Sequence, residues 1–394
     1  MQQELINRSP DLKKLRDEGH EVEIRGAFLV VNGVPYLNSL GVIKRGMIVS
    51  ELTLAGDRTT VPGTHVVHFI GEHPCRKDGS EISSIKHGTG DQQLAEGLVV
   101  NHSFSNKPAT GYANYHEKIA RYIEIISAPV RSIDPLMTAK TFNVIESRNG
   151  ECVFVYRDTN SSRAEIDLIS DKLRGQRVAI VGLGGTGSYV LDYVAKTPVA
   201  EIHLFDGDLF LQHNAFRAPG AAPIEVLREK PAKVEYYAQI YSRMHTGIIA
   251  HTEYIDPDNL TSFEGFSFVF ICIDRGEVKK ALTEHLESHG ISFVDVGMGI
   301  EAVDGSLLAM VRTTASTVRK RTHVHENGRI SLGANNPADE YATNIQIAEL
   351  NALNAAFAVI KWKKLCGFYG DVKHEHHSVY TLNDNMLLND DVKA

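Results

Sequence analysis

A glycine-rich turn is the first part of the chain that could do chemistry. Its sequence is Gly182-x-Gly184-Gly185-x-Gly187, and it directly follows the apolar run 177–181. Glycines let a backbone turn tightly and approach a phosphate closely, and the start of a following helix offers free N–H groups to an anion. The motif alone indicates a nucleotide without choosing between NAD, FAD and ATP. A plain packing turn would use the same glycines.

Acidic, amide and cationic side chains follow the next predicted strand. Asp206 ends that strand, where a dinucleotide enzyme would use an acid to bind ribose hydroxyls. Asp208, Asn214 and Arg217 come next, and Lys233 follows them. A hydride-transfer enzyme has no need of this arginine and lysine, whereas a nucleotidyl-transfer enzyme uses such cations to neutralise the departing phosphates. The pattern therefore favours nucleotidyl transfer.

An aspartate ends a second buried strand. The run 266–273 is almost wholly apolar, and Asp274 follows it. Open α/β sheets bind their ligands at the carboxyl ends of the strands, and a carboxylate there can hold a Mg²⁺ ion that bridges phosphates. Asp274 is therefore the predicted metal ligand.

Taken together, these elements resemble the ubiquitin-activating-enzyme superfamily, which includes the ThiF and MoeB adenylyltransferases of the thiamine and molybdopterin pathways. The shared pattern is G-x-G-G-x-G, then D-x-D-x-x-x-x-x-N-x-x-R, then a lysine before Val-Glu, then an aspartate after an apolar strand. The resemblance implies an ATP- and Mg²⁺-dependent adenylyltransferase. In that family the C-terminal carboxylate of a ubiquitin-like protein attacks the α-phosphate of ATP and gives an acyl-adenylate and pyrophosphate.

The resemblance also assigns roles to single residues. The glycine turn would lie under the nucleotide, Asp206 would bind the ribose, and Asp274 would ligate Mg²⁺. Relatives also carry an arginine from just before the nucleotide domain, often donated across a dimer, and Arg163 is the candidate here. Relatives with structural zinc hold it in two C-x-x-C pairs, which this sequence lacks, so no structural zinc is expected. The expected catalytic residues are Arg217, Lys233, Asp274, Asn214 and Arg163, and the expected nucleotide-binding residues are Gly182, Gly184, Gly185, Gly187, Asp206 and Asp208.

The residue that would receive the activated carrier is an open question. Many relatives use a cysteine in the crossover loop after the sheet, but residues 311–344 contain none. Unactivated hydroxyls are poor nucleophiles, so the chain is expected to stop at the adenylate or to pass it to a partner. Cys75 lies beside Arg76 and near histidines, which could lower its pKa, and it would serve only if the amino-terminal module were conjugating-enzyme-like. The hydroxyls that the loop offers instead are Thr313, Thr314, Ser316 and Thr317.

Two modules must position these residues, and together they predict an α/β protein. Residues 1–150 are dense in turn signals and are predicted to form a smaller α+β domain. Its role is unknown, and our hypothesis is that it recruits a partner. Within them, Asn32-Gly33 between two apolar runs predicts a β-hairpin. Residues 151–394 alternate apolar strands with helices, which predicts a Rossmann-like ThiF/MoeB nucleotide-binding domain whose parallel sheet is covered on both faces.

Composition limits the remaining choices. The chain has 394 residues and a net charge of −8, which argues against nucleic acid as the main partner. It has four scattered cysteines, no signal-peptide core at its start and no apolar run long enough for a membrane, so a reducing cytoplasm is expected. The strongly apolar helix predicted over 341–364 would be buried in the core or at a subunit interface, and a homodimer is the expected state. The expected partners are a ubiquitin-like carrier protein and a conjugating-enzyme-like protein.

Three other functions compete with this interpretation. A ThiF-like enzyme could adenylate a tRNA base or a peptide, although the acidic net charge disfavours tRNA. An NAD-dependent oxidoreductase would leave Arg217, Lys233 and Asp274 unexplained. A non-catalytic activating-enzyme-like scaffold would not need the metal aspartate and both phosphate cations that are present here.

Overall fold

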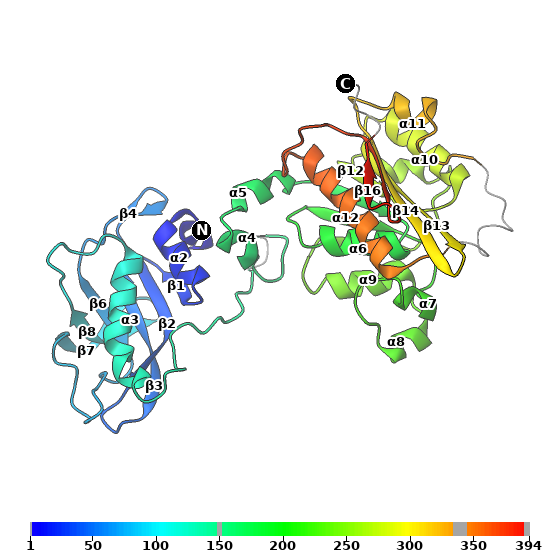
Figure 1. Ribbon diagram of the computed structural model, residues 1–394. Coiled ribbons are helices and arrows are strands. Elements are labelled where there is room, and N and C mark those ends of the chain that lie inside the picture. The colour runs from blue at the N-terminus through cyan, green and yellow to red at the C-terminus, as the bar shows by residue number, and fades with distance from the viewer. Residues whose placement is uncertain (1, 148–151, 334–344, 390–394) are drawn as a thin grey trace. The chain divides into compact units, whose positions relative to one another are not determined.

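The structure is a computed structural model that describes residues 2–147, 152–333 and 345–389. It divides into two units (Figure 1), of which the first is Met1–Ile145 with Ser162–Ala164 and the second is Glu146–Ser161 with Glu165–Ala394. Each unit has its own hydrophobic core. Within the described ranges, no helix is both long enough and apolar enough to cross a membrane.

The first unit is built on a six-stranded antiparallel sheet with the strand order β1-β2-β3-β6-β8-β7. The helix α3 (Tyr115–Arg131) packs on this sheet, because its apolar side chains recur at helical spacing and share one core with the strands. Asn114 caps α3, since its side chain accepts a hydrogen bond from the backbone N–H of Glu117 at 2.9 Å. The other elements are α1 (Gln2–Arg8), α2 (Pro10–Asp17), β1 (Glu21–Arg25), β2 (Phe28–Leu37), β3 (Ile43–Glu51), β4 (Leu54–Ala55), β5 (Arg58–Thr59), β6 (Val66–Ile70), β7 (Lys86–Ala95) and β8 (Leu98–Ser105).

The hairpin predicted at Asn32-Gly33 is wrong. The strand β2 continues through both residues, and its register against β3 shifts between Val31 and Val34. Two residues of β2 therefore face one residue of β3, which is a β-bulge. Gly33, at φ +70°, supplies a left-handed backbone that suits a bulge as well as a tight turn, so the local sequence does not distinguish the two.

The second unit is built on an eight-stranded sheet with the order β11-β10-β9-β12-β13-β14-β15-β16. The pairs from β11 to β13 are parallel, as the alternation of strands and helices predicts. The pairs from β13 to β16 are antiparallel and extend the sheet on one side. The strands are β9 (Arg177–Val181), β10 (Glu201–Phe205), β11 (Ile248–His251), β12 (Phe268–Ile271), β13 (Ser292–Val303), β14 (Ser306–Ser316), β15 (His377–Thr381) and β16 (Met386–Leu388).

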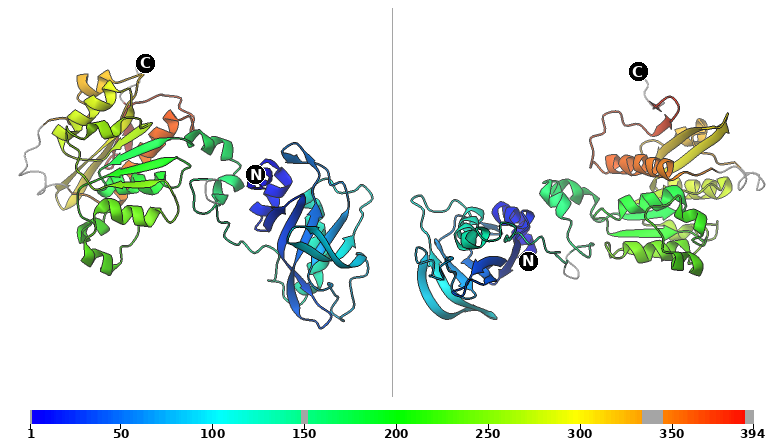
Figure 2. Two further views of the ribbon diagram at one scale, coloured as in Figure 1. Left: turned by 180° about the vertical axis from the view of Figure 1, so that it is seen from behind. Right: turned by 60° about the horizontal axis from the view of Figure 1, so that its bottom comes forward.

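Helices cover both faces of this second sheet (Figure 1, Figure 2). Alternate residues of β9 belong to two different cores, Val178 and Ile180 to one and Ala179 and Val181 to the other, because successive side chains of a strand point to opposite faces. The first core also contains α6 (Gly185–Val194), α9 (Lys233–Tyr241) and α12 (Ala348–Leu365), and the second contains α10 (Gly276–Ser288) and α11 (Thr322–Glu326). The remaining helices are α4 (Thr159–Arg163), α5 (Asp167–Ser170), α7 (Gln212–Ala215), α8 (Ile224–Glu229) and the 3₁₀ helices η1 (Asp171–Leu173) and η2 (Leu260–Phe263).

The stretch 311–344, expected as a crossover loop, begins as a strand instead. β14 continues to Ser316, where it pairs with Phe293 of β13. This correction matters for the hydroxyls expected there, because all four side chains lie in or just after the strand and are buried. Residues 334–344 of the stretch lie outside the described residues, as do the first residues of the helix expected over 341–364, which is seen as α12 from Ala348.

Candidate active site

The carboxyl ends of β9, β10 and β12 carry the residues that the sequence singled out. β9 lies between β10 and β12, and the chain passes outward from β9 to β10 and β11 before it returns to β12 on the other side. A reversal of this kind is the point at which open α/β sheets bind ligands. Gly182 follows β9, Asp206 follows β10, and Asp274 comes shortly after β12. The fold thus brings three distant parts of the sequence to one edge of the sheet.

The glycine turn is shaped by close backbone contacts. Gly182 has φ +87°, and a Cβ on Gly187 would lie 1.8 Å from the carbonyl oxygen of Gly182, so neither position tolerates a side chain without movement. A Cβ on Gly185 would lie 2.1 Å from the side-chain nitrogen of Asn351 on α12. Gly184 differs from these three, because a Cβ there would meet no atom within 4 Å. The open side of the turn is therefore at Gly184, the residue that directly precedes α6.

Asp206 connects the glycine turn to the segment after β10. One carboxylate oxygen accepts the backbone N–H of Leu183 at 2.7 Å, and the other accepts the N–H of Asp208 at 2.8 Å. Lys233, at the start of α9, places its Nζ 3.4 Å from Asp206 and 2.6 Å from Asp208. The Asp206 and Lys233 side chains are each only 7% exposed, whereas that of Asp208 is 50% exposed. A buried cation thus joins two acids directly beside the turn.

The charge of Asp208 is held by its neighbours. Partial burial by itself would raise the pKa of Asp208, but hydrogen bonds from Lys233 and Tyr254 outweigh it, and the pKa lies below its ordinary value. The Tyr254 hydroxyl donates to Asp208 over 2.7 Å, and the Arg275 guanidinium lies 5.1 Å from the centre of the Tyr254 ring. Asp208 is therefore ionised near neutral pH.

Arg217 is a half-buried cation with spare donor capacity. Its Nε is buried with no hydrogen-bond partner among the described residues. Burial lowers the pKa of Arg217, and the negative charges of Asp274 and Asp208 offset only part of that effect. An unsatisfied buried donor on a charged group is costly unless a ligand supplies the acceptor. Arg217 is thus placed to meet an anion near Asp274, which is exposed shortly after β12.

Asn214 has a structural task in this geometry. It is 3% exposed, and its side-chain oxygen accepts the backbone N–H of Leu211 at 2.8 Å. This bond closes the turn of α7 that leads to Arg217. The structure thereby brings Asn214, Arg217, Lys233, Asp206 and Asp208 into the same unit as Asp274 and the glycine turn.

Arg163 is the one expected site residue that groups elsewhere. It is exposed at the end of α4, within the segment Ser162–Ala164 that belongs to the first unit. The neighbouring Ser162 is hydrogen-bonded to Arg16 and Asp17 of that unit. The role expected for Arg163 therefore stays a prediction.

Cys75, the cysteine considered as a nucleophile, is not activated. Cys75 is 1% exposed, and burial raises the pKa of its thiol, with nearby carboxylates adding to the effect. Burial also raises the pKa of Cys366 to about 11. A thiol with a raised pKa carries little thiolate at neutral pH, and the thiolate is the nucleophile. The lowered pKa considered for Cys75 from its neighbours is wrong, because its Sγ points to the carbonyl of His73 inside the fold.

Three residues near the site have no signal in the sequence. Asn351 of α12 accepts a hydrogen bond from the Thr186 hydroxyl at 2.9 Å and packs on the glycine turn. Tyr254 donates a hydrogen bond to Asp208, and Arg275 stacks on the Tyr254 ring. Each lies outside the motifs, so only a contact map could have identified it.

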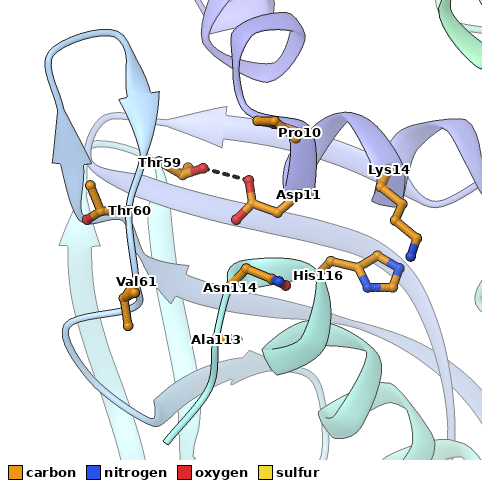
Figure 3. Close-up of a pocket in the computed structure, with 9 residues that line it drawn as sticks. All are labelled: Pro10, Asp11, Lys14, Thr59, Thr60, Val61, Ala113, Asn114 and His116. Carbon is orange, nitrogen blue, oxygen red and sulfur yellow. Dashed lines mark hydrogen bonds between the residues drawn. The ribbon is translucent and has the colours of Figure 1, made fainter. Parts of the chain in front are cut away.

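The first unit has a hollow of its own, with a volume of about 410 Å³, between α2, β5 and the start of α3 (Figure 3). Asp11 lies at its centre, where one carboxylate oxygen accepts the Thr59 hydroxyl at 2.5 Å and the other accepts the backbone N–H of Tyr115 at 2.9 Å (Figure 3). His116 at its rim lies 2.9 Å from Glu18. Asp11 thus links its own helix α2 to β5 and α3. We therefore interpret the contacts around this hollow as part of the packing of the first unit.

Comparisons with known proteins agree with the geometry of the second unit. The ThiF family model matches residues 159–364, which is just over half of the chain, and a model described as a domain of unknown function (DUF6791) matches residues 10–159. Ubiquitin-like modifier-activating enzyme 5 of Drosophila mojavensis is 23% identical over 155 residues, covering 35% of this chain and 37% of that protein. The tRNA threonylcarbamoyladenosine dehydratase of Escherichia coli (strain K12) is 28% identical over 123 residues, covering 30% of this chain and 45% of that protein.

The chain thus spans less than half the length of these two curated relatives. Among solved structures, the crystal structure of E. coli MccB has a TM-score of 0.46 and 15% sequence identity, and the match covers 67% of this chain and 76% of that one. The family model, the glycine turn and the acidic and basic residues at one edge of a mainly parallel sheet agree with one another. The chain belongs to the ThiF family.

Proposed function

We propose that the second unit is an ATP-dependent adenylyltransferase that activates the C-terminal carboxylate of a ubiquitin-like protein. The observation that carries this proposal is Arg217, a half-buried side chain whose buried Nε has no partner among the described residues and which lies near Asp274. A polyphosphate supplies the acceptors that such a donor needs, and Arg is well matched to phosphate oxygens. ThiF membership and the resemblance to activating enzymes support the same chemistry.

The nucleotide would lie over the glycine turn. Gly184 has open space on its Cβ side, which allows the backbone to approach a phosphate, and the first N–H groups of α6 follow it. Asp206, already held by two backbone N–H groups, would accept a ribose hydroxyl. Lys233 and Arg217 would neutralise the phosphates, while Asn214 keeps the turn before Arg217 closed.

In the proposed reaction, a carboxylate oxygen of the carrier attacks the α-phosphorus of ATP. The bond from that phosphorus to the bridging oxygen of the β-phosphate breaks, and pyrophosphate leaves with the electron pair. Negative charge grows on the departing group, so preplaced cations stabilise the transition state more than the ground state. The exposed carboxylate of Asp274 is the hard oxygen ligand that Mg²⁺ prefers, and Mg²⁺ held there would add positive charge beside the phosphates.

Several further features belong to this proposal. Arg163 is exposed and could be donated to the site of a second copy, which fits a homodimer. The first unit would recruit a protein partner, either the carrier or a conjugating-enzyme-like protein. The compartment would be the cytoplasm, where the four cysteines, all free in the structure, would stay reduced.

A second candidate is adenylation of a tRNA base. It is favoured by the relatives named as tRNA threonylcarbamoyladenosine dehydratases. The net charge of −8 counts against it, because tRNA binding is dominated by contacts of cations with phosphates. The two candidates share the nucleotide site and differ in the acceptor.

Exchange of labelled pyrophosphate into ATP tests both candidates. The full chain would be assayed with Mg²⁺ and, in parallel, with ubiquitin-fold proteins encoded beside its gene and with total tRNA. We expect exchange that depends on a protein carrier and that Asp274→Asn abolishes while leaving the fold intact. Glu284→Gln, an exposed acid on α10, is the matched control and should keep full exchange.

Three results would count against the proposal. Exchange that requires tRNA and no protein carrier would establish the second candidate instead. Full exchange by Asp274→Asn would remove the proposed magnesium ligand. If the folded chain bound no ATP at all, both candidates would fail.

A further inference from the structure

Two histidines and a glutamate lie close together at the edge of the second sheet that is opposite to the glycine turn. His285 lies in the last turn of α10, His289 directly follows that helix, and Glu264 precedes β12. One ligand atom from each of the three lies within 4.8 Å of the other two. The amino ends of β12 and β13 are at this edge, whereas the glycine turn follows the carboxyl end of β9. The cluster is therefore separate from the proposed nucleotide site.

The tautomer of His289 can be assigned from its contacts. Its Nδ1 lies 2.9 Å from the backbone carbonyl oxygen of His285, and a carbonyl oxygen can only accept a hydrogen bond. Nδ1 therefore carries the proton, and in the neutral ring the lone pair is on Nε2. That Nε2 lies 3.8 Å from a carboxylate oxygen of Glu264. A backbone carbonyl on the far nitrogen is the outer contact that typically orients a metal-binding histidine.

His285 supplies a second unused nitrogen. Its Nε2 is buried and has no hydrogen-bond partner among the described residues. The rings of His285 and His289 stack with their centres 4.2 Å apart, so the two side chains share one face of the helix end.

We propose that Glu264, His285 and His289 form a binding site for a divalent transition-metal ion, with Zn²⁺ as the best match. Two imidazole nitrogens one helical turn apart plus a carboxylate oxygen are a donor set that Zn²⁺ accepts, and a water completes the four ligands. Tetrahedral Zn²⁺ needs ligand atoms about 3.3 Å apart, so the 3.8 Å between His289 and Glu264 must close slightly. Both side chains can move, because they are 43% and 56% exposed.

The bound ion would tie the end of α10 to the segment that leads into β12. A cation at this place is also favoured by the partial negative charge at the carboxyl end of a helix. The site uses none of the cysteine pairs expected of zinc-binding relatives, and it requires no nucleotide. Its role is to stabilise the fold of the second unit.

The test uses the full chain, freed of metal with EDTA and kept at pH 7.5. Titration with Zn²⁺ by calorimetry should show one site per chain with a dissociation constant in the micromolar range or below. Co²⁺ should give the visible absorption of a tetrahedral site. His289→Gln and His285→Gln should each weaken binding by about tenfold or more, and Zn²⁺ should raise the thermal midpoint of the wild-type chain but not of these variants.

His325→Gln is the matched control. His325 is an exposed histidine on α11, and its Nε2 lies 2.7 Å from Glu287 of α10. It has no part in the three-residue cluster. This variant should bind Zn²⁺ as the wild-type chain does. The proposal fails if the wild-type chain has no such site, or if His289→Gln binds Zn²⁺ with unchanged affinity. It also fails if His325→Gln loses as much affinity as the cluster variants.

Discussion

Replacement of Arg217 by methionine should separate nucleotide binding from stability. The Nε of this half-buried side chain is buried and has no hydrogen-bond partner among the described residues, and burial lowers the pKa of Arg217 in spite of the charge of Asp274. In the folded chain without ATP, the guanidinium therefore gains little and loses hydration. Methionine has a similar length and no charge to bury. We expect the free energy of unfolding to stay within about 1 kcal/mol of the wild-type value or to rise.

ATP binding should respond in the opposite direction. A hydrogen bond to a charged group contributes about 1.5–3 kcal/mol, and each 1.4 kcal/mol is about tenfold in affinity. Loss of the Arg217 contact with phosphate should thus weaken ATP binding by about 10- to 150-fold. Titration with a fluorescent ATP analogue in the presence of Mg²⁺ measures this change, and urea denaturation measures the stability.

Arg228→Met is the matched control, because Arg228 is exposed on the nearby helix α8. It should change neither quantity. The reasoning is refuted if Arg217→Met binds ATP within about threefold of the wild-type chain while remaining folded. A loss of more than about 2 kcal/mol in unfolding free energy would also refute it, since Arg217 would then support the fold.

Three further predictions concern stability and the turn. Burial lowers the pKa of Lys118 from 10.5 to about 8. Between these pH values the unfolded state therefore binds more protons than the folded state, and the free energy of unfolding should rise with pH. In urea denaturation at several pH values, Lys118→Met should remove this rise and should add at most about 3 kcal/mol to the free energy of unfolding near pH 7. Lys233→Met should lower the free energy of unfolding by about 3 kcal/mol, because it leaves the buried acid Asp206 without its cation. Lys230 is exposed, so Lys230→Met should change the free energy of unfolding by less than about 0.5 kcal/mol. Equal losses in both variants would contradict this reasoning. Gly187→Ala should destabilise the fold by about 1–3 kcal/mol or more in thermal unfolding, because its Cβ would lie 1.8 Å from the carbonyl oxygen of Gly182. Gly184→Ala should keep the stability of the wild-type chain and weaken only ATP binding. A Gly187→Ala variant as stable as the wild-type chain would refute the contact.

The sequence predicted the parts of the site that depend on local pattern. The glycine turn, the acid after the next strand and the aspartate after a buried strand are each recognisable within a few residues. Parallel strands align their carboxyl ends, so three such local signals predict one shared edge. The structure has Gly182, Asp206 and Asp274 after neighbouring strands of a single sheet.

Local pattern failed where two structures need the same residue types. Asn32-Gly33 is equally suited to a hairpin and to the bulge within β2, and only the pairing of β2 with β3 decides between them. Cys75 has charged neighbours in the sequence that would favour a thiolate, yet it is 1% exposed, and burial raises its pKa. A pKa depends on the surroundings in space, which a linear sequence does not contain.

The amino-acid sequence by itself determined the family, the parallel strands and the residue types available for phosphate chemistry, because these depend on short-range spacing. Only the tertiary structure decided how those residues are partnered. It joined Lys233 to two acids, left Arg217 Nε without a partner among the described residues, and placed Tyr254 and Asn351 beside the motifs. It also gathered Glu264, His285 and His289 at the far edge of the sheet. Such contacts join residues from separate elements, so their energies are set by packing and burial, which no local pattern encodes.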